Sequence, residues 1–188
     1  MWVEKTGTHS GGGNFYTDKD LKEKLTIKNC NIKNYESGVA ASLDKSYLLN
    51  NNFENNHYGT DIWDANKIVP PPTGQTGLGL TYIQQGDNIF KNNIFKNNFE
   101  VGLGIFNSEN NLLENNLFEN NKKGAHPGNG YGIVKNNLFK NNRVMGVGAY
   151  SKALVKNNEF LGNGQITKID KDVFQNSAVL SYYSSIKN

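Results

Sequence analysis

Only a few side chains in this sequence could do acid–base or charge-neutralising chemistry. The chain has three histidines, and Arg143 is its one arginine. Abstracting a proton next to a carboxylate requires a base, together with a group that neutralises the carboxylate. Residues of suitable type gather around the segment YGTDIW, which begins at Tyr58, and recur further along the chain. The candidate catalytic residues are therefore Asp61, Tyr58, Lys67, His126 and Arg143.

These residues support glycoside hydrolysis and metal binding less strongly. Hydrolysis requires paired carboxylates, whereas Asp61 is the one carboxylate expected on the candidate face. Asp61 and Asp64 are the candidates to hold a Ca²⁺ ion, and apart from this ion we expect no cofactor. Cys30, the one cysteine, excludes a thiolate metal cluster; it lies in a column of asparagines, where a packed thiol is expected.

Aromatic residues near these candidates indicate a binding site. Three of them, Trp63, Phe106 and Tyr150, end a short segment that starts with glycine, and Tyr82 lies one residue beyond such a segment. Apolar faces of sugar rings pack on aromatic side chains, so solvent-facing aromatics above small residues favour carbohydrate binding. The alternative is that these aromatics simply favour strands and stack on one another between coils.

An internal repeat predicts the elements that position these residues. The chain contains 32 asparagines among 188 residues, and most recur in phrases such as FKNNIFKNN and VKNNLFKNN. When the phrases are aligned on a central apolar residue, the steps between centres are 21, 42, 23, 21 and 21 residues. Because 42 is twice 21, we expect a coil without the phrase in the second step. The aligned centres are Ile32, Phe53, Phe95, Phe118, Phe139 and Phe160.

The aligned phrases form columns of similar residues. Asparagine stands three positions before every centre, and two positions after every centre except the last, where Gly162 replaces it. One position after the centre, lysine and glutamate alternate from Lys33 to Lys140, so opposite charges one coil apart can pair. A helical array is not expected, since no window keeps helical apolar spacing, although TDKDLKEKL from Thr17 could form one short helical turn. We predict an all-β, single-stranded right-handed parallel β-helix of about seven coils of roughly 21–23 residues, with asparagine ladders.

The phrase GLGIFNSENNLLENNLFENN, from Gly102, resembles the right-handed parallel β-helix repeats of pectin-lyase-like proteins. It is also similar to the periplasmic β-helix family associated with copper-enzyme maturation. The resemblance covers residues 25–163 and implies the fold, but that architecture hosts lyases, hydrolases, epimerases, adhesins and phage tail proteins. No cluster of His, Met or Cys supports copper binding.

A second, shorter resemblance concerns the candidate catalytic segment. YGTDIW partly resembles the YGxDPH motif of mannuronan C5-epimerases and matches it at Tyr58, Gly59 and Asp61. Trp63 stands where that motif has its histidine. The resemblance implies acid–base chemistry on uronate polymers, in which family members use Lys, Arg, His or Tyr, often with Ca²⁺.

We expect one domain with three parts. Residues 1–24 form an N-terminal cap or edge coil, residues 25–163 form the β-helix, and residues 164–188 form a C-terminal edge coil or cap. The insertion 64–77 contains three consecutive prolines, which cannot donate to a β-ladder, so it should leave the barrel as a loop.

The third strand of each coil should follow a glycine, as in GTDIW, GLGIF and GVGAY. The same pattern assigns GLGLT, from Gly77, to the coil without the phrase. Strand alternation turns one set of residues inward and exposes Asp61, Gly104 and His126 together with the aromatic residues. An exposed face that continues along a repeat array suits an extended polymer.

The function we favour is an extracellular module that binds an extended polysaccharide along this aromatic and glycine face. One alternative is a polysaccharide lyase or uronate C5-epimerase. Another is a structural module of an adhesin, surface-layer protein or phage fibre.

Other partners are not expected. Lysines are interleaved with glutamates, which argues against nucleic acid, and no apolar run approaches about 18 residues, which argues against membrane insertion. The first residues, MWVEKTGTHSGGG, lack the apolar stretch of a secretion signal. We therefore expect a mature form or a fragment, located outside the cell or on its surface, within a larger surface protein or an end-to-end assembly.

Overall fold

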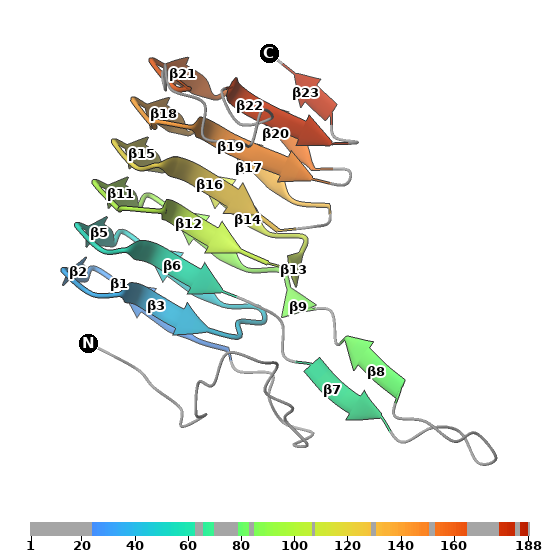
Figure 1. The fold of residues 1–188 in the computed structure, drawn as a ribbon. Helices are drawn as coiled ribbons and strands as arrows, with labels where there is room; N and C mark the ends of the chain where they lie inside the picture. The colour runs from blue at the N-terminus through green and yellow to red at the C-terminus, as the bar shows by residue number, and fades with distance from the viewer. Residues whose placement is uncertain are drawn as a thin grey trace.

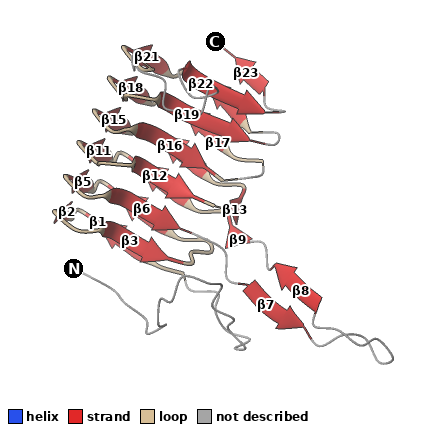
Figure 2. Cartoon of the chain, in the orientation of Figure 1, coloured by secondary structure: helices blue, strands red, loops and turns tan. Residues whose placement is uncertain are grey.

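The computed structural model describes residues 24–62, 66–69, 79–82, 85–106, 108–128, 131–150, 153–164, 177–182 and 185–187. The predicted N-terminal cap therefore lies almost wholly outside the described residues. Successive coils stack along one axis, and their strands line up in long sheets (Figure 1). Figure 2 shows that strands and loops make up the described chain. No helix among these residues is long and apolar enough to cross a membrane.

Three parallel sheets run along the stack. The first contains β1 (Thr26–Lys28), β4 (Tyr47–Leu49), β10 (Ile89–Lys91), β14 (Leu112–Glu114), β17 (Ile133–Lys135), β20 (Leu154–Lys156) and β23 (Ser185–Lys187). The second contains β2 (Asn31–Lys33), β5 (Asn52–Glu54), β11 (Ile94–Lys96), β15 (Leu117–Glu119), β18 (Leu138–Lys140) and β21 (Glu159–Leu161). The third contains β3 (Ser37–Ala41), β6 (Tyr58–Ile62), β12 (Val101–Ile105), β16 (Lys123–Pro127), β19 (Met145–Tyr150) and β22 (Ser177–Tyr182).

The predicted parallel β-solenoid is confirmed, but the coil count was slightly too high. The second and third sheets each have six strands, so the described chain makes six complete coils, and β23 begins a seventh. The extra coil expected between Phe53 and Phe95 is not interposed, because β4 pairs directly with β10 and β5 with β11. A repeat step of 42 residues therefore contains one coil and an insertion.

Part of this insertion is a hairpin. Strand β7 (Asn66–Val69) pairs antiparallel with β8 (Gly79–Tyr82), and the two lie beside the stacked coils (Figure 1). The expectation that GLGLT forms the third strand of a coil was wrong, because β8 pairs with β7 and not with the third sheet. After the hairpin, β9 (Gln85–Gly86) pairs in parallel with β13 (Ser108–Glu109).

The two asparagines of each pair have different roles. The first residue, for example Asn50, has a positive φ of 55° and turns the chain sharply between sheets. Asparagine tolerates this left-handed conformation better than other non-glycine residues. The second residue, for example Asn51, is buried, and its Nδ2 donates a hydrogen bond to Oδ1 of Asn93 in the next coil at 3.1 Å. These bonds repeat from coil to coil and confirm the predicted asparagine ladders.

The interior is a stack of the central apolar residues. The rings of Phe53, Phe95, Phe118, Phe139 and Phe160 lie nearly parallel, with successive centroids between 4.7 and 5.0 Å apart. All but the last are fully buried. The repeat thus places one aromatic ring directly above another in adjacent coils, and this stack forms the middle of the core.

The outer charge columns also pair as predicted. Glu119 lies between two lysines of adjacent coils, 3.2 Å from Lys96 and 3.0 Å from Lys140. On the first sheet, Glu114 lies between Lys91 at 3.1 Å and Lys135 at 3.0 Å. The alternation of charge therefore neutralises columns that would otherwise repel along the stack.

Candidate functional site

The outer face of the third sheet brings a carboxylate and an imidazole onto one line. Asp61, Gly104 and His126 are in-register neighbours on β6, β12 and β16. Adjacent strands lie about 4.8 Å apart, so Asp61 and His126 are separated by two strand spacings, with a glycine between them. The alternate residues Thr60 and Leu103 are fully buried, as the inward set should be.

An aromatic residue covers the imidazole at one margin of this face. Phe106, directly after β12, is 41% exposed, and its ring centroid lies 5.1 Å from that of His126. Nδ1 of His126 lies 2.8 Å from the carbonyl oxygen of Ile105. Because a carbonyl only accepts, Nδ1 carries the proton in the neutral ring, and Nε2 is the basic nitrogen.

The environment of His126 keeps it neutral. Burial lowers the pKa of this imidazole below its usual value of 6.5, against the opposing effect of the hydrogen bond to Ile105, and the nearby charge of Lys123 lowers it further. At neutral pH the ring is therefore uncharged, which is the form that can accept a proton.

Tyr58, at the start of β6, is held in its protonated form. Burial raises the pKa of the Tyr58 hydroxyl, and the negative charges of Glu100, Asp61 and Glu36 raise it further. A phenol in this environment donates a hydrogen bond at neutral pH and does not act as a phenolate base.

A column of residues at the corner between the second and third sheets, called the second corner, borders the same face. Most of this column was not predicted from the sequence. Its members stand four positions after the central residue of each phrase, and they are Glu36, His57, Phe99, Lys122 and Arg143. Register could have identified Phe99 and Lys122, since both directly follow the buried ladder asparagine. Arg143 was predicted as a candidate catalytic residue, but its place in this column and its contact with Phe99 were not.

Phe99 is the centre of this corner column. Its side chain is 58% exposed, and the imidazole of His57 stacks on it with centroids 5.1 Å apart and planes inclined by 25°. The Arg143 guanidinium carbon lies 5.8 Å from the ring centroid, and Nη2 donates to the Phe99 carbonyl oxygen at 3.2 Å. His57 also contacts Tyr58 edge-on at 4.7 Å, so the corner is continuous with β6.

Lys122, which follows Phe99 in this column, is already paired with a carboxylate. Nζ of Lys122 lies 2.8 Å and 2.9 Å from the two carboxylate oxygens of Glu100. Arg143 makes no ion pair with any described residue; its described contacts are those with Phe99. The corner therefore presents one guanidinium beside an internally paired lysine and glutamate.

The remaining predicted site residues do not join this group. Lys67 and Tyr82 lie on β7 and β8 of the hairpin, outside the third sheet, and Tyr150 ends β19. Trp63 and Asp64 lie outside the described residues. Among the described residues, no three His, Cys, Asp or Glu side chains come together to hold a metal ion. The structure thus joins Tyr58, Asp61, His126 and Phe106 on one face, with Arg143 at its margin.

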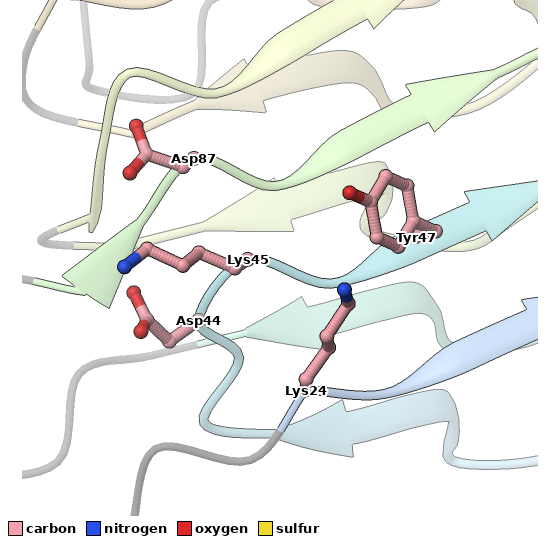
Figure 3. Close-up of a pocket in the computed structure, with 5 residues that line it drawn as sticks. All are labelled: Lys24, Asp44, Lys45, Tyr47 and Asp87. Atoms are coloured by element: carbon pink, nitrogen blue, oxygen red, sulfur yellow. The ribbon is translucent and has the colours of Figure 1, made fainter.

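A charged pocket lies at the third corner, where the chain enters the first sheet. It has a volume of about 450 Å³ and is lined by Lys24, Asp44, Lys45, Tyr47 and Asp87 (Figure 3). Lys24 Nζ lies 5.3 Å from the centroid of the Tyr47 ring, and Asp44 Oδ1 accepts a hydrogen bond from Gly86 N at 3.2 Å. Two lysines and two aspartates balance each other, and none of the five residues belongs to the third sheet.

Parallel strands repeated in every coil, a stacked aromatic core and buried asparagine ladders define a parallel β-solenoid. The family model of the right-handed β-helix region matches residues 8–187, and the chain belongs to this family. The pectin-lyase-like subtype is compatible with this membership. No curated protein and no solved structure matches the chain.

Proposed function

We propose that this protein binds an extended polysaccharide along the outer face of its third sheet, outside the cell or on its surface. The observation that carries the proposal is the exposed ring of Phe106, which packs on His126 beside the side-chain-free position of Gly104. A sugar ring can place its apolar face on Phe106 while its hydroxyls reach polar groups of Asp61 and His126.

The shape of the face fits a polymer better than a small molecule. Asp61, Gly104 and His126 form a straight row along the stack, and each strand adds about 4.8 Å to its length. Small molecules are usually enclosed in concave pockets. A row of partly exposed polar residues beside the exposed Phe106 ring supports contact with several consecutive units of a chain.

Replacement of Phe106 tests this proposal directly. We expect Phe106→Ala to weaken binding by about tenfold, because removal of one aromatic stacking partner costs on the order of 1–2 kcal/mol. Affinity electrophoresis in gels containing a panel of neutral and acidic polysaccharides measures the change.

Ile94→Ala is the matched control for this experiment. Ile94 is also 41% exposed, but it lies on β11 of the second sheet. If no polysaccharide retards the wild-type protein, or if both variants weaken binding equally, the third-sheet proposal is wrong.

A second proposal is a lyase or C5-epimerase acting on uronate polymers. It is supported by the neutral imidazole of His126, which has Nδ1 directed at a carbonyl and shares its face with Asp61. His126 would accept the C5 proton, Tyr58 would donate a hydrogen bond, and Arg143 would neutralise the carboxylate, while Lys67 stays a candidate on the hairpin. Asp61 is the candidate to hold a Ca²⁺ ion together with Asp64.

Incubation with alginate and pectate, with and without Ca²⁺, tests this chemistry. Elimination gives products with ultraviolet absorbance, and epimerisation changes the proton spectrum without chain cleavage. His126→Gln should abolish either reaction. Absence of both reactions excludes these substrates, and if polysaccharide binding also fails, the proposal that remains is a structural module of an adhesin, surface-layer protein or phage fibre.

A further inference from the structure

The guanidinium of Arg143 differs from the other cations of the corner and the neighbouring sheet. Lys122 pairs with Glu100, and Lys96 and Lys140 pair with Glu119. Arg143 has no carboxylate partner among the described residues, and its side chain is exposed to solvent. A guanidinium has five N–H donors, and only one of them has a described acceptor here.

Contacts with Phe99 hold this guanidinium in place. Nη2 donates to the Phe99 carbonyl oxygen at 3.2 Å, and the guanidinium carbon lies 5.8 Å from the ring centroid. His57 stacks on the same ring and restricts its movement. A long side chain that is already positioned loses less conformational entropy when it binds a ligand. Its planar fork matches the oxygens of a carboxylate or a sulfate.

The position of Arg143 links it to the proposed binding face. It lies two residues before β19, at the margin where the chain enters the third sheet. The row of Asp61, Gly104 and His126 lies three residues beyond the first residue of each strand, and Arg143 lies two residues before β19. About five residues of extended chain, or roughly 16 Å, therefore separate the Arg143 position from the row. A polymer on this face can therefore present a charged substituent to the corner.

We infer that Arg143 is an anion-binding group that makes the third-sheet face select acidic polysaccharides. The ligand group is an oxyanion on a sugar ring, either the carboxylate of a uronate or a sulfate ester. The inference rests on the proposed polysaccharide binding. Phe99 and His57 are positioning residues that act through Arg143.

Matched polymer pairs test the selection and distinguish the two oxyanions. Polygalacturonate is compared with its methyl-esterified form, and dextran sulfate with dextran, by titration calorimetry on the full chain. We expect wild-type protein to bind one acidic polymer about tenfold more tightly than its neutral counterpart, as a charge-assisted hydrogen-bonded pair should give. The pair that shows the preference identifies the oxyanion.

Charge removal at two sites separates a specific contact from general attraction. Arg143→Gln should lose the preference while still binding the neutral polymer, and Arg143→Lys should recover only part of it because the fork is lost. Lys28→Gln removes the same charge from an exposed position on the first sheet and should keep the preference. Phe99→Leu should weaken the preference without changing net charge.

A wild-type protein that binds both members of each pair equally overturns the inference and leaves polysaccharide binding intact. Equal losses in Arg143→Gln and Lys28→Gln also overturn it, since net charge alone would then explain the effect. Failure of wild-type protein to bind any of the four polymers overturns the proposed function as well. Thermal unfolding of each variant checks that it is folded.

Discussion

Asn120 and Asn121 are neighbours in the chain, but one side chain is exposed at a turn and the other is buried in the ladder. Asn120 has a positive φ of 55°, is exposed, and makes the sharp turn at the second corner. Asn121 is fully buried; its Nδ2 donates to the Phe95 carbonyl oxygen at 2.9 Å and to Asn142 Oδ1 at 3.1 Å, and its Oδ1 accepts from Asn98 N at 2.9 Å. Asn120 sets the backbone direction and adds one exposed hydrogen bond, from its Nδ2 to Asn97 Oδ1 at 3.3 Å, whereas Asn121 joins three coils from the interior.

This division predicts unequal effects of substitution at the two positions. Asn121→Ala should destabilise the protein by about 3 kcal/mol or more, because it leaves buried donors and acceptors of adjacent coils without partners. Asn120→Gly should change stability by less than about 0.5 kcal/mol, because glycine adopts the same turn conformation freely. Urea unfolding measures both. Similar losses in the two variants would contradict the assignment of tasks.

The stacked core predicts a large cost for loss of one ring. Phe118→Ala removes a fully buried ring with centroids 5.0 Å from Phe95 and 4.7 Å from Phe139, and it should cost about 3–5 kcal/mol. Phe106→Ala removes the same side chain from the exposed face and should cost far less. Thermal and denaturant unfolding of the pair test whether stability and the proposed binding reside on different phenylalanines.

The charge column predicts a salt-dependent defect. Glu119→Lys replaces the carboxylate between Lys96 and Lys140 and puts three lysines next to one another along the second sheet. The variant should unfold at a lower temperature than wild type in dilute buffer, and the difference should shrink in about 1 M salt, where charges are screened within about 3 Å. A defect of equal size at both salt concentrations would show that packing, rather than repulsion, is responsible.

The pH dependence of stability should contain a contribution from His126. Burial lowers its folded-state pKa below the 6.5 expected of the unfolded chain, so the unfolded chain binds more protons between the two pKa values. This contribution is complete above the unfolded pKa and is lost as the pH falls through that window. His126→Gln should therefore flatten the fall in stability as the pH drops below 6.5, as followed by urea unfolding. An unchanged pH profile would contradict the burial of this ring.

The 42-residue step between Phe53 and Phe95 shows a limit of periodic reasoning. Spacing alone treats 42 residues as two coils, because nothing in the count distinguishes a coil from an insertion of the same length. Pairing decides the matter: β5 and β11 are direct neighbours, and part of the intervening chain pairs with itself as β7 and β8. Local antiparallel pairing of two nearby segments needs no crossover, unlike a further parallel coil.

The ladder at the third corner was also not predicted from the sequence. Nδ2 of Asn88 donates to Asn111 Oδ1 at 2.9 Å, and Ser46 N donates to Asn88 Oδ1 at 3.0 Å. Among the described residues this short ladder joins three coils, with a serine at its start, so it has no regular phrase. Gly162, the exception in the regular column, has a φ of 62° and meets the same turn requirement as the asparagines.

The sequence by itself determined the solenoid, its ladders, its aromatic core and its alternating charge columns. It could do so because stacked coils place equivalent residues in contact, so each three-dimensional contact repeats as a spacing along the chain. Only the tertiary structure decided which residues form a site. The contact of Arg143 with Phe99 spans two coils, and that of Phe106 with His126 joins adjacent strands. Neither contact repeats in the other coils that the structure describes, so no periodic signal marks it, and side-chain direction at a corner depends on the folded neighbours.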